Sequence, residues 1–355
     1  MFLPVACSPP SLQGLAADAC RQHPKNVLAA SKKAGGSSKA PLPMGMSPAA
    51  AASSSSAAGA AAGALRHSHV LPVFVFDPRF LGTGRSAFGF QKSSHIRARF
   101  LRECVEDLRR SLRARGSDLL VCCGSPEVVI PSVCAQVDAR AVYAFSEWAF
   151  EEQQVETATA VALQKQNVQL RTCWGGTLVH LDDLPFDIAG GFPQTFTQFR
   201  SRVERNFQVR PSAEHSLLAS SVVLPLPPQV AAAASAPPQA ASAPSAAAGS
   251  VTLDCSLPMP SFAALGYDES EVAAYRPDPR SAFPFAGGES AALARIRQYM
   301  WDQDRLRAYK ETRNWMLGAE YSSKLSPFLA HVRFFVPVCV SYRSTFFSID
   351  SCLAN

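Results

Sequence analysis

The chain has 355 residues, enough for two domains of ordinary size, and a modest net charge of +6. This charge permits a basic face toward nucleic acid but is lower than that of a dedicated DNA clamp. The ten cysteines include no C-x-x-C pair and the seven histidines show no ligand spacing, so we predict no metal site. Cysteine spacing also favours reduced thiols in an intracellular compartment. No apolar run reaches the ~18–20 residues that span a bilayer, so we expect no membrane segment.

Two stretches are poor in large apolar side chains. Residues 40–65 and 211–250 consist largely of Ala, Ser, Pro and Gly, which bury too little area to offset chain entropy. We therefore divide the chain into a low-complexity leader (1–69), an α/β domain (70–210), an Ala/Pro-rich linker (211–260), the start of a helical domain (261–330) and a tail (331–355).

The leader is also poor in acidic residues, with Asp18 alone before Asp77. Ser- and Ala-rich leaders of this kind are typical of organelle transit peptides, which predicts a chloroplast or mitochondrial protein. The alternative is a low-complexity extension that carries no targeting signal, on a protein of the nucleus or cytoplasm.

Apolar runs and helical stripes alternate from Val70 onward. VLPVFVF (70–76) is apolar throughout, as expected for a strand buried on both faces of a parallel sheet. The same reasoning predicts strands at 118–123, 139–145 and 168–174, and helices at 95–115, from Ser125 and at 151–166. This alternation predicts a doubly wound α/β domain with a parallel sheet. The segment 287–314 shows helical periodicity and no strand signal.

The helix at 95–115 carries seven arginines, which is compatible with a nucleic-acid face. Glu103, Glu106 and Asp107 are interleaved with them at helical neighbour spacings. We therefore favour a solvated outer face of ion pairs.

Two stretches are specific beyond their periodicity. WGGTLVHLDDLPF (174–186), followed by FTQFRSRVE (196–204), resembles the end of the α/β domain of the cryptochrome/photolyase family, most closely its DASH branch. YKETRNWMLGAEYSSKLSPFLA (309–330) resembles the flavin-binding segment of the same family. The resemblance covers about 70–210 and about 287–330, and its motifs stand in the family's order.

This resemblance implies a photolyase-type antenna domain followed by the start of an all-helical FAD-binding domain. The family's chemistry is light-driven electron transfer from FAD to pyrimidine dimers in DNA, or blue-light sensing. The cofactor performs the chemistry and the protein sets its position and surroundings, so we assign no catalytic residue. DNA is the partner that the family implies.

The resemblance also implies the residues that contact FAD. In the family these are the tyrosine of YKETRN and the SSKLS run, which correspond here to Tyr309, Ser322, Ser323, Lys324, Leu325 and Ser326. Hydroxyl groups and free amides at the start of a helix favour an anion, Lys324 adds positive charge and Tyr309 adds a donor. The run is therefore suited to the pyrophosphate of FAD.

A second cofactor is implied for the α/β domain. Family members can hold a folate, methenyltetrahydrofolate, through an acidic residue on the helix after the third of these strands. Glu151 or Glu152 occupies that place. The alternative is that each glutamate is only a solvated surface charge.

Both ends of the chain depart from the family. The tail 331–355 has no family likeness, and the family's opening strand with its Arg-x-Asp-Leu-Arg motif is absent. MFLPVAC (1–7) is a candidate to substitute for this strand, although proline in a central strand argues against it. We therefore expect a chain truncated at both ends, with impaired activity.

A function of another class stays open. The α/β domain can act as a non-catalytic binding or interaction module without flavin. An unrelated nucleotide-binding protein lacks support, because neither G-x-G-x-x-G nor G-x-x-x-x-G-K-[ST] occurs.

Overall fold

A computed structural model describes residues 2–7, 68–174, 177, 179–206, 225–230, 251–281, 283–316 and 318–331. Most of the predicted leader and linker, and nearly all of the tail, lie outside these ranges. The described strands are β1 (Phe2–Cys7), β2 (His69–Phe76), β3 (Leu120–Cys123), β4 (Ala139–Phe145) and β5 (Gln169–Cys173). The α-helices are α1 (His95–Arg113), α2 (Pro126–Gln136), α3 (Phe150–Gln164), α4 (Phe196–Asn206), α7 (Glu269–Ala274), α8 (Glu289–Arg297), α9 (Tyr309–Thr312) and α10 (Ser326–His331).

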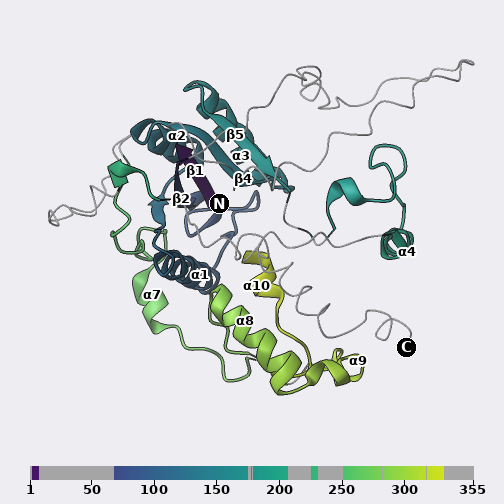
Figure 1. Cartoon of the computed structure of the whole chain (residues 1–355). Coiled ribbons are helices and arrows are strands. Elements are labelled where there is room, and N and C mark those ends of the chain that lie inside the picture. The colour runs from purple at the N-terminus through teal and green to yellow at the C-terminus, as the bar shows by residue number, and fades with distance from the viewer. Residues whose placement is uncertain are drawn as a thin grey trace, which may run out of the picture.

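The strands form one five-stranded sheet in the order β3-β2-β1-β4-β5. β2 and β3 pair in parallel, as do β4 and β5, and each parallel pair is joined by a helix. Figure 1 shows α2 and α3 on one side of this sheet and α1 on the other. The predicted α/β class and the predicted strands from 70 to 174 are confirmed.

The centre of the sheet differs from the sequence prediction. β1 lies between β2 and β4 and runs antiparallel to both, so MFLPVAC does supply a central strand in spite of its proline. Pro4 pairs with Pro72, but the ladder with β4 begins only at Val5. The ladder of β2 with β3 likewise begins only at Val73. Both prolines therefore stand beside the end of an outer ladder, where a missing N–H costs little.

The two faces of the sheet bury separate cores. Alternate residues of β2 face opposite sides, so Leu71 and Val73 pack with α2 and α3 while Phe76 packs against α1. Both faces of the sheet are thus covered. This explains why VLPVFVF reads as one continuous apolar run.

Part of the predicted linker contributes to these cores. Val230, Leu253 and Cys255 are buried among residues of the sheet and α2. Farther along, Leu265 and Tyr267 pack beside α1, and the Tyr267 hydroxyl donates to the Ser93 carbonyl at 3.1 Å. Residues on both sides of the predicted boundary at 260 therefore pack against the α/β layers, and the division into domains stays a prediction.

The charged face of α1 is held by ion pairs. Arg99 lies 3.0 Å from Glu103, and Arg110 lies 2.8 Å from Asp107. Arg109 instead is buried and donates to the carbonyls of Leu119 and Leu257. These contacts support the interpretation of this surface as a solvated face of ion pairs, in preference to a nucleic-acid-binding face.

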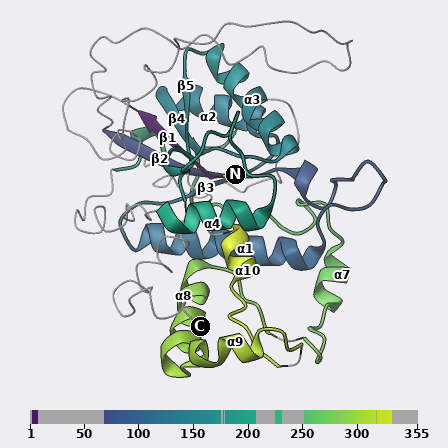
Figure 2. The same cartoon turned by 90° about the vertical axis from the view of Figure 1, so that its right-hand side faces the viewer.

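The N-terminus of α8 docks on α1 through a pair of glycines. The Gly287 amide donates to Glu103, the Gly288 amide to the Cys104 sulfur, and the Ser290 amide to Asp107 at 3.0 Å. Gly288 has a φ of 116°, and a Cβ there would come within 2.8 Å of Asp107. Only glycine fits this junction. Figure 2 shows α8, α9 and α10 below α1, with the sheet above it.

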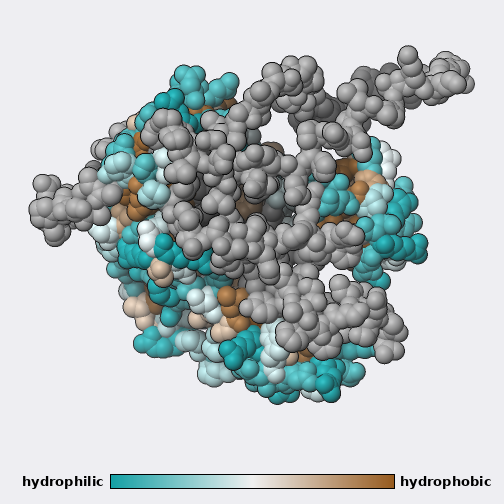
Figure 3. All heavy atoms as spheres, in the orientation of Figure 1, coloured by the Kyte–Doolittle hydropathy of each residue, from teal (hydrophilic) through white to brown (hydrophobic). Residues whose placement is uncertain are grey.

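Hydrophilic residues prevail on the surface near α8 and α9, at the lower edge of Figure 3. Within the described residues, no helix is both long and apolar enough to cross a membrane.

Candidate functional site

The structure brings the two parts of the predicted flavin segment together. Tyr309 begins α9, and its side chain is 38% exposed. After α9 the segment folds back on itself, and the Thr312 hydroxyl donates to the Tyr321 carbonyl at 3.0 Å. This bond ties α9 to the Ser-Ser-Lys run, so Tyr309 and Ser322 belong to one local structure.

One buried side chain that the sequence analysis did not single out organises the loop. Arg295 of α8 is only 3% exposed, and its guanidinium donates to the carbonyls of Ala319, Ser322 and Ser323 at 2.9, 3.3 and 3.0 Å. It also meets the Glu320 carboxylate at 3.3 Å. An arginine between Ala292 and Ile296, on the apolar stripe of its helix, was the available signal.

The ring faces around Arg295 complete its enclosure. Its guanidinium lies 4.7 Å from the ring centre of Phe283 and 5.0 Å from that of Tyr299. A planar guanidinium stacks well on aromatic rings and keeps its charge when buried. The loop carbonyls thus point inward to a fixed charge.

Of the remaining predicted residues, Leu325 is buried in a core and Lys324 packs over an aromatic ring. Leu325 is buried with Phe328 and Phe100, which fixes the start of α10 against α1. Lys324 adopts a left-handed backbone with φ of 60°, and its ammonium lies 3.3 Å from the ring centre of Tyr321. A left-handed non-glycine residue is uncommon and often marks a functional turn.

The serine hydroxyls of the run are unengaged within the described part of the chain. Ser322 and Ser323 are half-buried, Ser326 is exposed, and none has a hydrogen-bond partner for its hydroxyl among the described residues. Together with the charge of Lys324 in the same run, these groups suit an anionic ligand such as a phosphate. They therefore fit the polar part of FAD.

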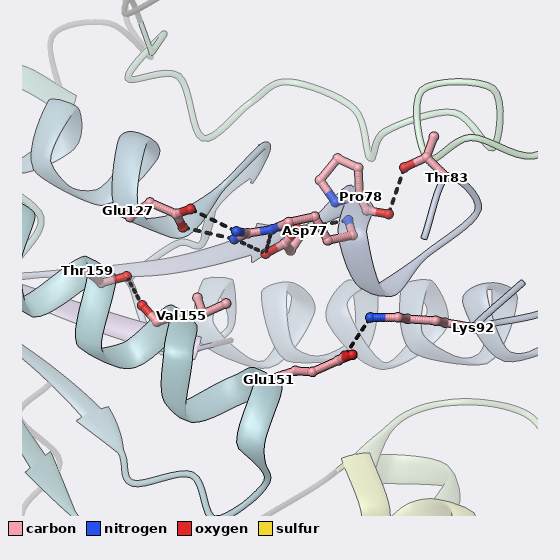
Figure 4. Close-up of polar contacts among 9 residues, drawn as sticks. Asp77, Pro78, Thr83, Lys92, Glu127, Glu151, Val155 and Thr159 are labelled. Carbon is pink, nitrogen blue, oxygen red and sulfur yellow. Dashed lines mark hydrogen bonds and ion pairs between the residues drawn. The ribbon is translucent and has the colours of Figure 1, made fainter. Parts of the chain in front are cut away.

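The two antenna candidates have different surroundings. Glu151 is half-exposed and pairs with Lys92 at 2.5 Å, as Figure 4 shows. Glu152, its neighbour on α3, lines a cavity of about 350 Å³. The structure therefore separates a solvated ion pair at Glu151 from a carboxylate beside a cavity at Glu152.

This cavity lies at the carboxyl ends of β2 and β4. Aromatic and aliphatic walls come from the sheet and α1, and its polar rim contains Asp77, Arg97, Asp107, Glu147, Glu152, Glu289 and His331. The order of strands reverses between these two ends, which is where open α/β sheets usually bind ligands. Acidic groups outnumber basic ones, so the cavity favours a ligand that offers N–H donors.

Two groups near the rim, Arg79 and His331, have defined electrostatic surroundings. Arg79 bridges Asp77 at 2.6 Å and Glu127 at 2.8 Å, and its contacts with both carboxylates are drawn in Figure 4. At the opposite side, burial and the nearby Arg97 lower the pKa of His331 to about 4. His331 is therefore neutral near pH 7 and can serve as a hydrogen-bonding group.

Comparisons with known proteins identify relatives of this chain. A family model described as DNA photolyase matches residues 53–217. A cryptochrome DASH from Gloeobacter violaceus is 43% identical over 265 residues, covering 75% of this chain and 46% of that protein. A rice protein named cryptochrome DASH, chloroplastic/mitochondrial (Oryza sativa subsp. japonica) is 37% identical over 275 residues, covering 74% and 42%. A crystal structure of a Synechocystis cryptochrome has 34% identity and a TM-score of 0.60, covering 79% of this chain and 51% of that one.

The α/β sheet, followed by helices that carry the YKETRN and SSKLSP motifs, has the order of parts that the resemblance implied. The chain belongs to the cryptochrome/photolyase family. Within that family, its curated relatives are cryptochrome DASH proteins. The chain spans less than half of the length of these relatives.

Proposed function

We propose that this chain is a DASH-type flavoprotein that holds FAD at the loop 318–326. The observation that carries the proposal is the clamp by Arg295, which fixes three loop carbonyls inward. Its consequence is that Lys324 and the hydroxyls of Ser322 and Ser323 are left for an anionic ligand. Tyr309 supplies a further hydroxyl at the start of α9.

The bound flavin would supply light absorption and electron transfer, and the protein would position it. In this division of labour Arg295 holds the loop in place, and Lys324 and the serine hydroxyls bind phosphate oxygens. Light-driven repair of pyrimidine dimers in DNA, or blue-light sensing, is the activity that we propose for the complete site. The chain spans less than half of its relatives, so cofactor binding by the loop that it contains is the property to test first.

The cavity beside Glu152 suits the proposed folate antenna. A pterin ring offers N–H donors and flat apolar faces, which match the carboxylates and aromatic walls there. We therefore place methenyltetrahydrofolate at Glu152 and not at Glu151, which pairs with Lys92. Titration of the chain with the folate tests this choice, since E152Q should weaken binding and E151Q should not. Equal effects of both changes would refute it.

The second candidate function is a binding module without flavin. The same cavity favours it, because most of its lining comes from the α/β layers and none comes from residues 318–326, although Glu289 of α8 and His331 of α10 also contribute. A chain that binds the folate but no FAD would fit this candidate.

For location, we propose a chloroplast or a mitochondrion. The acid-poor leader supports this address, and the rice relative carries both organelles in its name. Expression of residues 1–69 fused to a fluorescent protein tests it, and uniform nuclear and cytoplasmic fluorescence would contradict it.

The experiment for the main proposal begins with the absorption spectrum of the purified chain after incubation with FAD. Cofactor released by denaturation should be FAD, in a ratio near one per chain. Lys324→Ala should weaken FAD binding about tenfold, because a charge-assisted bond to phosphate is lost. Lys165→Ala, at the end of α3, is the matched control and should bind as the unaltered chain does. A chain that stays colourless would refute the proposal.

A further inference from the structure

Tyr299 is a fully buried large side chain next to Arg295, the residue that clamps the candidate cofactor loop. It is 1% exposed, and its hydroxyl has no hydrogen-bond partner within the described part of the chain. A buried hydroxyl almost always has a partner, since leaving it unpaired costs on the order of 1–3 kcal/mol. The fold as described gains nothing from this oxygen, and phenylalanine would fill the same space.

The backbone under Tyr299 is also unusual. It lies in a π-helical turn, η3 (Gln298–Asp302), which directly continues α8. Such turns are rare and frequently occur at functional sites, because the wider turn redirects side chains away from the regular helical stripe. Here the turn sets Tyr299 against Arg295, whose guanidinium lies 5.0 Å from its ring centre.

The neighbours of the hydroxyl come from both parts of the candidate site. Burial raises the pKa of Tyr299, and Tyr309 and Glu320 raise it further while Arg295 lowers it. The ring of Tyr299 itself lies against Arg295, the residue that clamps the loop. At neutral pH the group is a protonated donor without an acceptor.

We propose that the Tyr299 hydroxyl is a ligand-binding group of this site, donating to a phosphate or ribose oxygen of a bound dinucleotide. The inference rests on the proposed function, because it needs a ligand between Tyr309 and the loop. It adds a residue outside the resemblance motifs, and it gives the unpaired hydroxyl an acceptor.

Tyr299→Phe provides the test, and Tyr267→Phe is a matched control. Both tyrosines are buried, but the Tyr267 hydroxyl already donates to the Ser93 carbonyl and lies beside α1. Binding of FAD and of ADP is measured by titration, and thermal stability is measured without ligand. Y299F should weaken binding of both ligands about tenfold or more while the unliganded chain becomes no less stable. Y267F should lower the stability and leave the affinity unchanged.

The outcomes separate the two proposals. If the unaltered chain binds FAD and Y299F binds it equally well, the role of Tyr299 is refuted and the flavin proposal stands. If Y299F lowers the stability as Y267F does, the hydroxyl has a structural partner and the inference also fails. If the unaltered chain binds neither FAD nor ADP, both proposals fall together.

Discussion

Arg295 shows how a single residue can shape a loop without touching its ligand. Its planar fork satisfies three backbone carbonyls and one carboxylate, and no other side chain can reproduce that geometry. Lysine would keep the charge but lose most of these bonds.

We therefore expect Arg295→Lys to lower the free energy of unfolding by about 2 kcal/mol, as buried carbonyls lose their donors. Hydrogen exchange of residues 318–326 should rise more than exchange in β2 or β4. The control is Arg297→Lys, an exposed position on the same helix, which should change neither quantity. Unchanged exchange in R295K would show that the loop holds its shape by other contacts.

His331 carries a second prediction at the residue scale, on pH. Its pKa in the folded chain is about 4, below the ordinary value near 6.5, because burial disfavours the charged form. Between these values the unfolded chain binds a proton that the folded chain does not, so stability falls as the pH drops from 6.5 toward 4. Melting temperatures across this range should fall less in His331→Gln. A slope equal to that of the unaltered chain would contradict the assignment.

At the scale of elements, the docking of α8 on α1 depends on backbone that only glycine adopts. Gly288→Ala places a Cβ within 2.8 Å of Asp107 in addition to the unfavourable positive φ. We expect a loss of about 3 kcal/mol or more in unfolding free energy, measured by denaturant titration. Gly116→Ala has a similar φ of 78° but open space around its Cβ, and it should cost only about 1 kcal/mol. Equal losses of unfolding free energy in the two variants would mean that the contact between α8 and α1 rearranges to accommodate the added Cβ.

The elements also show what the sequence could and could not predict. β2 to β5 and the helices between them follow from apolar runs and periodicity, because each signal lies within its own segment. The direction of β1 could not be predicted, since an isolated apolar run carries no information on its partners. The role of Pro4 depends on where the ladders end, which is a tertiary property.

The candidate site divides in the same way. Tyr309 and the SSKLS run were found because a contiguous motif carries them. Arg295 was missed because its acceptors are backbone carbonyls, which every residue has, and they lie more than twenty residues along the chain.

At the scale of the molecule, β1 joins two halves of the sheet that do not otherwise pair. β1 is the strand that hydrogen-bonds to both β2 and β4, so removal of residues 1–7 leaves two long strands with unpaired edges. We expect this deletion to cause aggregation, as judged by size-exclusion chromatography. Deletion of seven residues from the Ala/Ser tract, 51–57, is the control and should leave the elution volume of the unaltered chain. An unchanged elution volume after removal of β1 would refute its structural role.

The position of β1 has a consequence for the life of the protein in the cell. A transit peptide is normally removed after import. The segment that we propose as the targeting signal, however, begins with β1, the central strand of the sheet. Residues 2–7 cannot be removed by cleavage and also remain as the central strand of the folded sheet. The pairing of β1 therefore predicts that the imported protein keeps its first residues, and N-terminal sequencing of the organelle form would show Phe2 or its neighbours intact.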